Sequence, residues 1–291
     1  MTGPAERSAR PVTDGLVVVD KAAGCTSHDV VARCRRIFGQ RRVGHAGTLD
    51  PDATGVLLVG LGRVTRLLRF LTVLPKSYTA EVVLGVATST LDASGEVVGE
   101  WDMGAVSLAQ VQEAATGFVG EIDQVPPMVS AVRVGGRRLH ELARAGVEVE
   151  RAARRVVVHR FDVSATEEPG VLRVEVDCGS GTYVRSLAAD IGAALGGGAH
   201  LRNLRRTAIG SFTAADGLAV DQLGEADVLS PAAALRDYPR LVLDGDGVRE
   251  VSFGRGLATP NPGPHALVDQ GGHLLAVYDD GRPAVVLAPA G

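Results

Sequence analysis

The chain has 291 residues, of which 45% are hydrophobic, and this is enough for one large domain or for a domain with an appendage. Its 30 basic and 34 acidic side chains give a formal net charge of −4, which argues against a protein that coats nucleic acid with its whole surface. The charge is uneven, because residues 1–75 and 131–160 are each net basic whereas residues 76–130 are acidic. Such blocks fit one localised polyanion-binding face as well as they fit ordinary solvated arginines.

Cysteine, histidine and apolar patterns exclude several classes of site. The three cysteines include no Cys-x-x-Cys pair, which is typical of a reducing cytosol and argues against a disulfide framework or a zinc knuckle. The seven histidines show no metal-ligand spacing, so no metal is expected. No segment approaches the roughly 20 apolar residues that span a bilayer. We therefore expect a cytoplasmic protein that does not enter membranes.

The N-terminal elements begin after a polar stretch. Residues 1–14 carry Pro, Gly, Ser and charge without an apolar signal core, and we expect a disordered leader there. The apolar run 16–19 predicts a buried strand. Thr26, followed three residues later by Asp29, matches the capping box that begins a helix, and Gly39 is expected to end that helix.

Residues 44–55 form the most informative segment of the chain. Asp50 lies between glycines and directly before Pro51, in a stretch too rich in turn formers for a helix or a regular strand. The apolar residues 56–59 follow at once and can anchor this loop in a core. An Asp-Pro turn is by itself an ordinary structural feature, but a lone carboxylate held on such a loop is also a candidate reactive group.

The middle of the chain mixes strands and helices without a regular repeat. Residues 78–86, 156–163 and 171–178 predict strands, and the last of these alternates apolar and charged residues as an antiparallel strand with one wet face does. Residues 106–118 and 184–195 predict helices with one apolar side. We expect an α+β fold with a mixed, largely antiparallel sheet flanked by helices.

A break near residues 231–239 separates the C-terminal part of the chain. Beyond it, four short apolar segments alternate with Gly, Pro and Asp turns, which predicts a small β-rich domain of about fifty residues. We therefore expect a main domain of residues 15–236 and a second domain of residues 237–291.

Arg185 is a candidate partner for Asp50. It falls in the first turn of the helix predicted at 184–195, where the helix dipole disfavours a cation. A nearby carboxylate would offset this, and the guanidinium would in turn keep Asp50 ionised and fix its direction. A surface salt bridge is the simpler alternative for Arg185.

Two other arginine-rich segments leave alternatives open. Residues 200–206 contain three arginines, which suit phosphate contact but also occur at the basic end of a helix. Residues 124–155 combine a Pro-Pro-Met run, a Gly-Gly turn and many arginines, which fits either a mobile basic lid or a helical hairpin with a solvated face. Nucleotide-binding glycine loops and hydrolase elbows are absent from the sequence, so no organic cofactor is expected.

Six short blocks follow one another over about residues 15–215. They are Lys21-x-x-Gly24-x-Thr26-Ser27, Gly44-His45-Ala46-Gly47-Thr48-Leu49-Asp50-Pro51-x-Ala53-Thr54-Gly55, Lys76-Ser77-Tyr78, Pro126-Pro127-Met128-x-Ser130-Ala131, Gly181-Thr182-Tyr183-x-Arg185 and His200-Leu201-x-x-Leu204-Arg205-Arg206. In this order they resemble the motifs of the TruB family, the tRNA pseudouridine-55 synthases. One departure is Ala22, where the family usually has Pro after the lysine.

The resemblance implies a pseudouridine synthase fold and an isomerase that converts uridine 55 in the T arm of tRNA to pseudouridine without a cofactor. Asp50 would be the catalytic carboxylate, either as a nucleophile at the sugar or as a base at C2′. Arg185 would pair with Asp50, and Tyr78 would stack on the uracil and help to remove the C5 proton. Three further residues would contact the substrate, namely Tyr183 and Leu204 along the base pocket and His45 where the target base leaves the stack.

The resemblance also implies where RNA is held. Residues 124–155 match the family's RNA-gripping insertion, which we expect to be mobile until RNA binds, and residues 237–291 resemble the family's PUA-like RNA-binding modules. Lys21 matches a family position near the active site and is expected to have a more structural role. The residues expected to contact RNA are Lys21, Arg137, Arg138, Arg154, Arg202, Arg205 and Arg206.

The expected partner is therefore the T arm of tRNA, with no protein partner implied and with a monomer as the expected state. Two other functions stay open at this point. The chain could modify another RNA, such as ribosomal RNA, or it could be an RNA-binding or RNA-folding module without catalysis. A hydrolase that uses Asp50 lacks a second carboxylate at a recognisable spacing.

Overall fold

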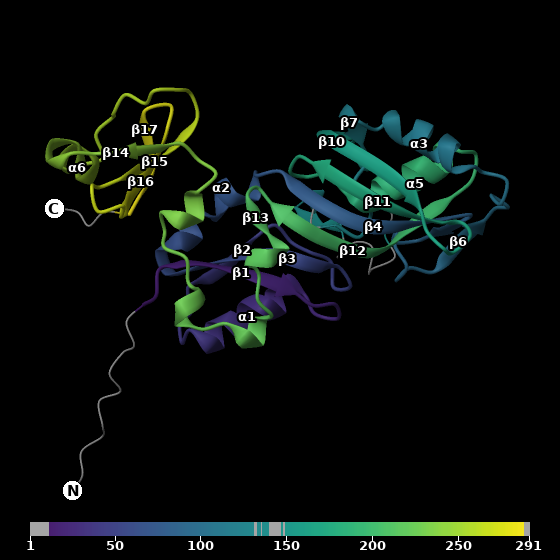
Figure 1. The fold of residues 1–291 in the computed structure, drawn as a ribbon, viewed down its shortest axis with the longest axis horizontal. Coiled ribbons are helices and arrows are strands. Elements are labelled where there is room, and N and C mark those ends of the chain that lie inside the picture. Colours follow the sequence, from purple (N-terminus) through teal and green to yellow (C-terminus); the bar gives the residue numbers. More distant parts are fainter. Residues whose placement is uncertain (1–11, 131–132, 135, 140–146, 148, 288–291) are drawn as a thin grey trace, which may run out of the picture.

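The computed structural model describes residues 12–130, 133–134, 136–139, 147 and 149–287 (Figure 1). Its largest element is a nine-stranded sheet. The strands of this sheet are β1 (Gly15–Lys21), β2 (Val43–Ala46), β3 (Thr54–Leu61), β4 (Lys76–Leu84), β7 (Gly120–Gln124), β10 (Arg154–Ala165), β11 (Val171–Cys178), β12 (Ala199–Ile209) and β13 (Phe212–Thr213).

The strands follow the order β1-β3-β12-β4-β11-β10-β7, with β2 paired to β3 and β13 paired to β12. Within this sheet the pairing of β3 with β12 is parallel, and the other pairings are antiparallel. This confirms the prediction of a mixed, largely antiparallel sheet. The parallel pair joins the N-terminal half of the sheet to its C-terminal half, and the candidate site lies at this junction.

The N-terminal half of the sheet is covered on both faces. Along β1, Leu16 and Val18 face one core cluster, whereas Val17 and Val19 face another. Because strand side chains alternate, a strand buried on both sides must be apolar at every position, as this run is. The helix α1 (Ser27–Ile37) covers one face and begins with the predicted Thr26 capping box, which is confirmed.

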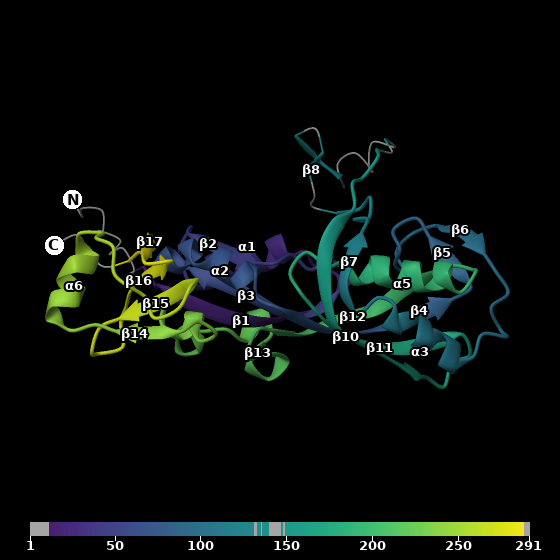
Figure 2. The ribbon, with the colours of Figure 1, turned by 90° about the horizontal axis from the view of Figure 1, so that it is seen from above.

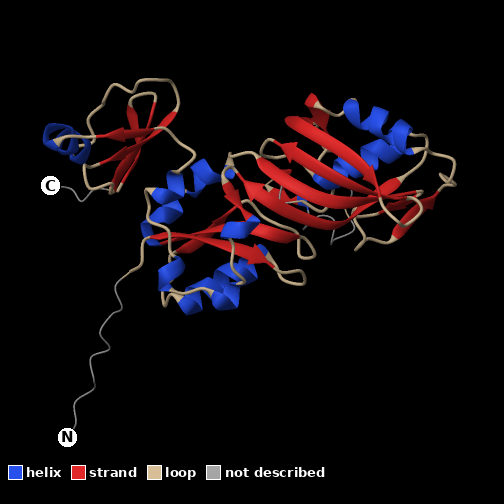
Figure 3. Cartoon of the chain, in the orientation of Figure 1, coloured by secondary structure: helices blue, strands red, loops and turns tan. Residues whose placement is uncertain are grey.

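The other half of the sheet carries α3 (Leu108–Thr116) and α5 (Val184–Ala194), which share one core cluster with β4, β10, β11 and β12 (Figure 3). A capping box of Ser107 and Gln110 begins α3, and the helices predicted at 106–118 and 184–195 are confirmed with shorter bounds. A separate hairpin of β5 (Val86–Thr88) and β6 (Val97–Glu100) follows β4.

The C-terminal residues form a second, four-stranded sheet of β14 (Arg240–Val242), β15 (Pro264–Val268), β16 (Leu274–Asp279) and β17 (Arg282–Val286). The four predicted strands are confirmed, but α6 (Gly245–Ser252) was not predicted. Figure 2 shows this sheet at one end of an elongated molecule, with α3 and β6 at the other end.

The small sheet is fixed to the main body by apolar packing and by arginines. One set of its buried residues, among them Val268 and Val277, belongs to the same core cluster as Phe70, while another set packs with α6 in a cluster of its own. The contacting segment consists of the 3-10 helix η1 (Gly62–Arg66) and the helix α2 (Leu68–Thr72). Its three arginines donate to backbone carbonyl oxygens at the end of the chain, Arg63 to Leu287, Arg66 to Val286 and Arg69 to Ala284. These arginines therefore serve domain docking.

Four short 3-10 helices and one small hairpin complete the described elements. The 3-10 helices are η2 (Ala214–Asp216), η3 (Val220–Gln222), η4 (Glu225–Asp227) and η5 (Ala233–Leu235). The hairpin consists of β8 (Arg133–Val134) and β9 (Arg137–Arg138), and Figure 2 shows β8 standing away from the main sheet. None of the helices in the described ranges has the length and apolar composition to cross a membrane.

Two expectations from the sequence need correction. The leader predicted over residues 1–14 is too long, because Thr13 exchanges two hydrogen bonds with Gln40 and Asp14 accepts from Arg63. Residues 1–11 lie outside the described part of the chain. Residues 200–206 lie within the strand β12, so the basic helix end considered for them is wrong.

Candidate active site

Asp50 lies on the loop between β2 and β3, and this loop is held on both sides of it. On one side, Ser27 exchanges hydrogen bonds with both backbone groups of Leu49, at 2.9 and 3.2 Å. On the other side, the carbonyl oxygen of Pro51 accepts from Lys21 Nζ at 2.9 Å and from the Gly24 backbone N–H at 3.0 Å. The prediction of a loop over residues 44–55 is too long at both ends, because residues 44–46 belong to the strand β2 and residues 54–55 to the strand β3.

Lys21 is therefore a structural residue of this loop. Its side chain is 1% exposed, and Nζ donates to the carbonyl oxygens of Ala22, Cys25 and Pro51 at 2.7 to 2.9 Å. An ammonium group has three N–H donors, so these acceptors satisfy all of them. The assignment of Lys21 to RNA contact is wrong, because RNA cannot reach its buried charge.

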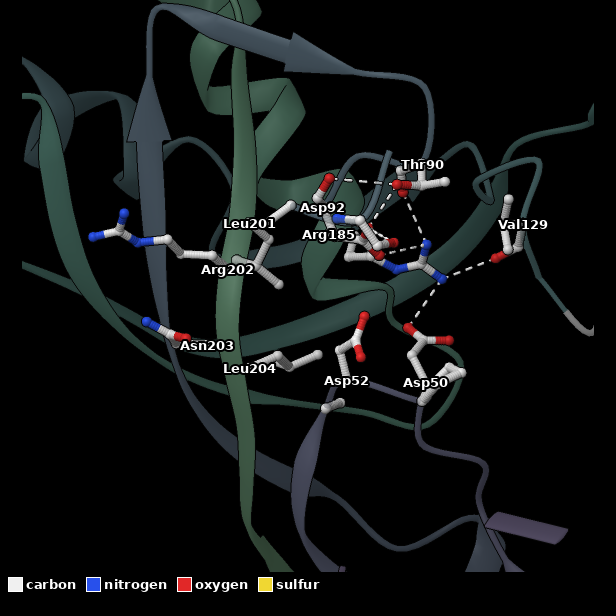
Figure 4. A pocket seen from close by; sticks show the side chains of 14 residues that line it. Asp50, Asp52, Thr90, Asp92, Val129, Arg185, Leu201, Arg202, Asn203 and Leu204 are labelled. Carbon is white, nitrogen blue, oxygen red and sulfur yellow. Dashed lines mark hydrogen bonds and ion pairs between the residues drawn. The ribbon is translucent and has the colours of Figure 1, made fainter. Parts of the chain in front are cut away.

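Arg185 lies at the start of α5 and contacts Asp50, as predicted (Figure 4). Its side chain is 5% exposed, and Nη2 lies 3.0 Å from Asp50 Oδ2. Nη1 lies 3.2 Å from Asp92, and the guanidinium also donates to the carbonyl oxygens of Thr90 and Val129, each at 2.8 Å. The alternative of a surface salt bridge is wrong, because the guanidinium is buried and each of its two terminal nitrogens contacts a carboxylate and a carbonyl oxygen.

Asp92 is a residue of this network that the sequence did not single out. Thr90 Oγ1 donates to its carboxylate at 2.6 Å, and the backbone N–H of Ser94 donates at 3.1 Å. These bonds fix Asp92 so that Arg185 is held between two carboxylates. Asp92 belongs to an acidic stretch without a recognisable motif, and only the fold brings it beside Arg185.

Burial raises the pKa of the Asp50 carboxyl above its ordinary value of 3.8, and the negative charge of Asp92 adds to the rise. The charge of Arg185 acts in the opposite direction but does not outweigh burial. The sequence predicted the effect of the guanidinium on this pKa but not the effects of burial and Asp92. The structure thus places a carboxylate of raised basicity against a fixed cation, which is an arrangement suited to a nucleophile or a base.

Two adjoining cavities meet at Asp50, Arg185 and Leu204, which line both of them. The first, of about 440 Å³, contains Asp92 and is drawn in Figure 4. The second, of about 460 Å³, is lined by Tyr78 and Tyr183, and we call it the tyrosine cavity. The structure therefore brings together Asp50, Arg185, Tyr78, Tyr183 and Leu204, which come from four separated parts of the sequence.

Tyr183 is oriented by a residue that the sequence did not reveal. Gln124, at the end of β7, is 2% exposed. Its side-chain oxygen accepts from the Tyr183 backbone N–H at 2.8 Å, and its Nε2 donates to the Tyr183 carbonyl oxygen at 3.1 Å. This two-bond clamp fixes the backbone of Tyr183 at the N-terminus of α5.

The register of β12 positions Tyr78 relative to the Asp50 loop. Arg206 pairs with Gly55 of β3 on one side and with Tyr78 of β4 on the other. Gly55 has φ +102°, and a Cβ atom there would lie 2.1 Å from the Arg206 carbonyl oxygen, so only glycine fits. Burial raises the pKa of the Tyr78 hydroxyl, while Arg206 opposes the rise.

The arginines of β12 are mostly committed to protein partners. Arg206 is 1% exposed and donates to the carbonyl oxygens of Val56 and Gly47, at 2.8 and 3.0 Å, so its assignment to RNA contact is wrong. Arg205 forms a two-bond pair with Asp20 at 2.7 and 2.9 Å. The Arg202 guanidinium contacts Glu81 at 2.6 Å and also Glu168, and both Arg202 and Arg205 keep partial exposure.

The segment 124–155 is described only in part, so the hypothesis of a mobile RNA grip lies partly outside the described residues. Arg137 and Arg154 are exposed, and the side chain of Arg138 is not among those described. Exposed arginines are available for phosphate contact, and their role stays a prediction.

His45 lies at the end of β2 beside His28, with the two rings perpendicular and their centroids 5.3 Å apart. Burial is the main cause that lowers the pKa of His45 to about 4, and the neighbouring His28 and Arg206 contribute to this lowering. Its Nδ1 atom has no hydrogen-bond partner within the described ranges. His45 is therefore neutral near pH 7, and any support it gives to RNA is by ring contact and not by charge.

Comparisons with known proteins point to one family. The family model described as "TruB family pseudouridylate synthase (N terminal domain)" matches residues 35–184, and that of the "tRNA pseudouridylate synthase B C-terminal domain" matches residues 185–243. A tRNA pseudouridine synthase B of Rhodococcus jostii (strain RHA1) is 46% identical over 302 residues, covering 100% of this chain and 99% of the relative. One of Mycobacterium sp. (strain KMS) is 47% identical over 294 residues, covering 97% and 99%.

Solved structures share the fold. A chain of an H/ACA RNP bound to a substrate RNA that contains 2′-deoxyuridine matches with a TM-score of 0.70 and 25% identity, covering 95% of this chain and 86% of that chain. A chain of a Cbf5-Nop10-Gar1 complex matches with a TM-score of 0.72 and 28% identity, covering 93% and 79%. The likeness to these structures extends over nearly the whole of this chain.

Proposed function

Because the chain belongs to the TruB family of pseudouridylate synthases, we propose that it isomerises uridine 55 in the T arm of tRNA to pseudouridine. In this reaction the bond between N1 of uracil and C1′ of the ribose breaks, the base turns, and C5 bonds to C1′. No atom is gained or lost, so the reaction needs no co-substrate. The observation that carries the proposal is the Asp50–Arg185 pair in the wall of the tyrosine cavity.

Asp50 is the proposed catalytic carboxylate, as a nucleophile at C1′ or as a base at C2′. Its side chain is 40% exposed to the cavities, whereas that of Arg185 is 5% exposed, so a substrate reaches the carboxylate and not the guanidinium. Arg185 holds Asp50 in position and favours its ionised form. Preorganised charge of this kind acts on the transition state without rearrangement during the reaction.

The tyrosine cavity is the proposed site of the flipped uracil. Extruding a base from folded RNA costs a few kcal/mol, and stacking on an aromatic ring recovers about 1–3 kcal/mol per base. Tyr78 and Tyr183 supply such rings, and Leu204 supplies an apolar wall between the two cavities. Tyr78 is also the proposed acceptor of the C5 proton. His45, at the near end of the Asp50 loop, is the proposed support where the base leaves the stack.

Residues 15–236 are the proposed catalytic domain, and residues 237–291 a PUA-like RNA-binding domain that acts with it on a single tRNA as a monomer. Two observations support this division into domains. The strands of the second sheet pair only with one another among the described strands, and residues of this sheet share a core cluster with the first domain. The proposed phosphate contacts are Arg137, Arg138, Arg154, Arg202 and Arg205.

The test is pseudouridine mapping on a T-arm transcript with the wild type and with Asp50→Asn. The wild type forms pseudouridine at position 55, and Asp50→Asn forms none above the background without enzyme. Asp52→Asn is the matched control, because Asp52 lies on the same loop but is exposed and forms no ion pair among the described residues. A wild type that modifies a ribosomal RNA fragment in preference to the T arm would contradict the proposed substrate.

A further inference from the structure

The chain contains two lysines among its 30 basic residues, and both are buried near the candidate site, Lys21 against the Asp50 loop and Lys76 in the lining of the tyrosine cavity. Lys21 is 1% exposed and Lys76 is 7% exposed. The other basic side chains are arginines. Lys21 and Lys76 therefore differ from them in carrying an ammonium group, and both lysines are buried. A buried lysine retains a compact charge that responds to its surroundings, which an arginine does not.

The two lysines differ in how their N–H groups are used. Lys21 Nζ has three acceptors, as described above. Lys76 Nζ donates to the carbonyl oxygens of Thr72 and Leu74, at 2.5 and 2.6 Å, just beyond the end of α2. Within the described ranges these are its two acceptors, so one of its three N–H groups is left over. Lys76 lines the tyrosine cavity, and Lys21 does not.

A second buried cation lies beside Lys76. Arg206 also lines the tyrosine cavity and is 1% exposed, and the charges of Lys76 and Arg206 repel each other. Among the described residues neither forms an ion pair with a carboxylate, although buried charges are usually paired. The part of the cavity wall that Lys76 and Arg206 form is therefore positively charged, and the Asp50 carboxylate in the same lining is paired with Arg185.

The titratable groups that face Lys76 leave it charged near neutral pH. Burial is the main cause that lowers the pKa of Lys76 to about 8, and the charge of Arg206 on β12 contributes to this lowering. Cys178 on β11 is the other group that acts on it, and burial raises the pKa of that thiol to about 11. The fold thus retains a cation in the cavity wall at a cost in solvation, which is characteristic of functional sites.

The reaction itself generates an anion at this place. When the N1–C1′ bond breaks, the bonding electron pair stays on N1, so the uracil is left with a negative charge shared with its carbonyl oxygens. We propose that Lys76, supported by Arg206, stabilises this detached uracil anion, an inference that rests on the proposed pseudouridine synthase activity. The free N–H of Lys76 donates to a uracil carbonyl oxygen, and the anion completes the pairing that the two cations lack.

A nucleobase fits this position better than a phosphate does. Both cations are more than nine-tenths buried in a cavity lined by Tyr78 and Tyr183, which offers ring faces to a planar base. Phosphates of folded RNA remain on its hydrated surface and are contacted by exposed arginines. Lys76 therefore interacts with a negative charge that appears only during the reaction. This interaction affects the reaction rate more than it affects the binding of RNA.

The test compares two leaving groups in single-turnover reactions of Lys76→Met. One T-arm RNA carries uridine at position 55 and the other carries 5-fluorouridine, whose uracil anion is the more stable. Conversion is followed by chromatography of the nucleosides after nuclease digestion. With fluorine at C5 the reaction stops once C5 has joined C1′, because no C5 proton can leave. We expect a loss of about 100-fold on uridine, the scale of removing one oxyanion donor, and a loss several times smaller on 5-fluorouridine.

Lys76→Arg keeps the charge and is the matched control. If Lys76→Met does not fold, the pH profile of Lys76→Arg provides a second test. The wild-type rate on uridine is expected to fall as the pH rises through about 8 and Lys76 loses its proton, and this fall is expected to be absent in Lys76→Arg.

Equal losses of Lys76→Met on the two RNAs, or a weakened affinity for T-arm RNA at unchanged rate, would overturn the inference. A pH-dependent fall that persists unchanged in Lys76→Arg would overturn it as well. The failure of the wild type to form pseudouridine would instead overturn the proposed function, so the two failures are distinct.

Discussion

The guanidinium of Arg185 lies 3.0 Å from the Asp50 carboxylate, although a loop between two strands supplies one residue and the first turn of a distant helix supplies the other. A cation at a helix N-terminus is unfavourable by itself. Here Asp50, Asp92 and two backbone carbonyl oxygens surround it, so its position is fixed by the tertiary structure and not by the helix. The direction of the Asp50 carboxylate depends on this arrangement.

Asp92→Asn tests that dependence. Without the Asp92 charge, Arg185 is free to shift toward Asp50 and loses one of its two anionic partners. We expect the rate of pseudouridine formation to fall by about 10- to 100-fold, since misplacing a catalytic group by a small distance has effects of that order. The measurement is a single-turnover rate on T-arm RNA, with RNA affinity measured separately. A large change in affinity at an unchanged rate would show that Asp92 acts elsewhere.

The raised pKa of Asp50 makes a prediction about acid pH. The proposed role of Asp50 needs its ionised carboxylate, so kcat/KM is expected to fall as the pH decreases, with a midpoint above 3.8 because burial favours the protonated form. A profile of kcat/KM against pH measures this midpoint. A midpoint at or below 3.8 would mean that Arg185 outweighs burial.

The same shift predicts the stability of Asp50→Asn. Between pH 3.8 and the raised pKa, the folded state binds more protons than the unfolded state, so stability decreases as the pH rises through this window. At pH 7 the ionised carboxylate therefore reduces stability, and Asn removes that effect while Asp92 still holds Arg185. We expect a melting temperature equal to or above that of the wild type. A clear decrease would show that the Asp50–Arg185 pair is needed for folding.

Gly55→Ala is expected to disrupt the junction of the two sheet halves. A Cβ atom there meets the Arg206 carbonyl oxygen at 2.1 Å and also requires an unfavourable positive φ. We expect a loss of more than about 4 kcal/mol in the free energy of unfolding, measured by denaturant titration. Gly181→Ala is the control, because it has φ +89° but no atom within 4 Å, and strain alone costs roughly 1–2 kcal/mol. Equal losses in the two variants would refute the clash.

The salt dependence of RNA binding distinguishes Lys21 from the exposed arginines. Each phosphate contact contributes about one to the slope of log affinity against log salt, so Arg154→Ala is expected to reduce the slope by about one. Lys21→Met is expected to leave the slope unchanged, because its charge is buried under three carbonyl oxygens. Titration of T-arm RNA at several salt concentrations measures both. A reduced slope for Lys21→Met would restore its assignment to RNA contact.

Local patterns in the sequence were sufficient for most elements. The capping box at Thr26, the alternation in residues 171–178 and the apolar run 16–19 each reflect contacts made within a few residues or with one neighbouring strand, and each was confirmed. The secondary structure of residues 200–206 was harder to predict, because an arginine-rich segment is polar whether it ends a helix or forms a strand. Their place in β12 is decided by the strands on either side.

By itself, the sequence determined the family, the mixed sheet and the loop that holds Asp50, because turn-forming residues and the order of motifs can be recognised along the chain. Only the tertiary structure decided what surrounds that loop. Asp92 reaches Arg185, Gln124 clamps Tyr183, and Lys76 faces the tyrosine cavity while Lys21 is enclosed in the loop. These relationships depend on burial and on contacts between distant segments. The residue type alone does not show whether a charged side chain is buried or exposed.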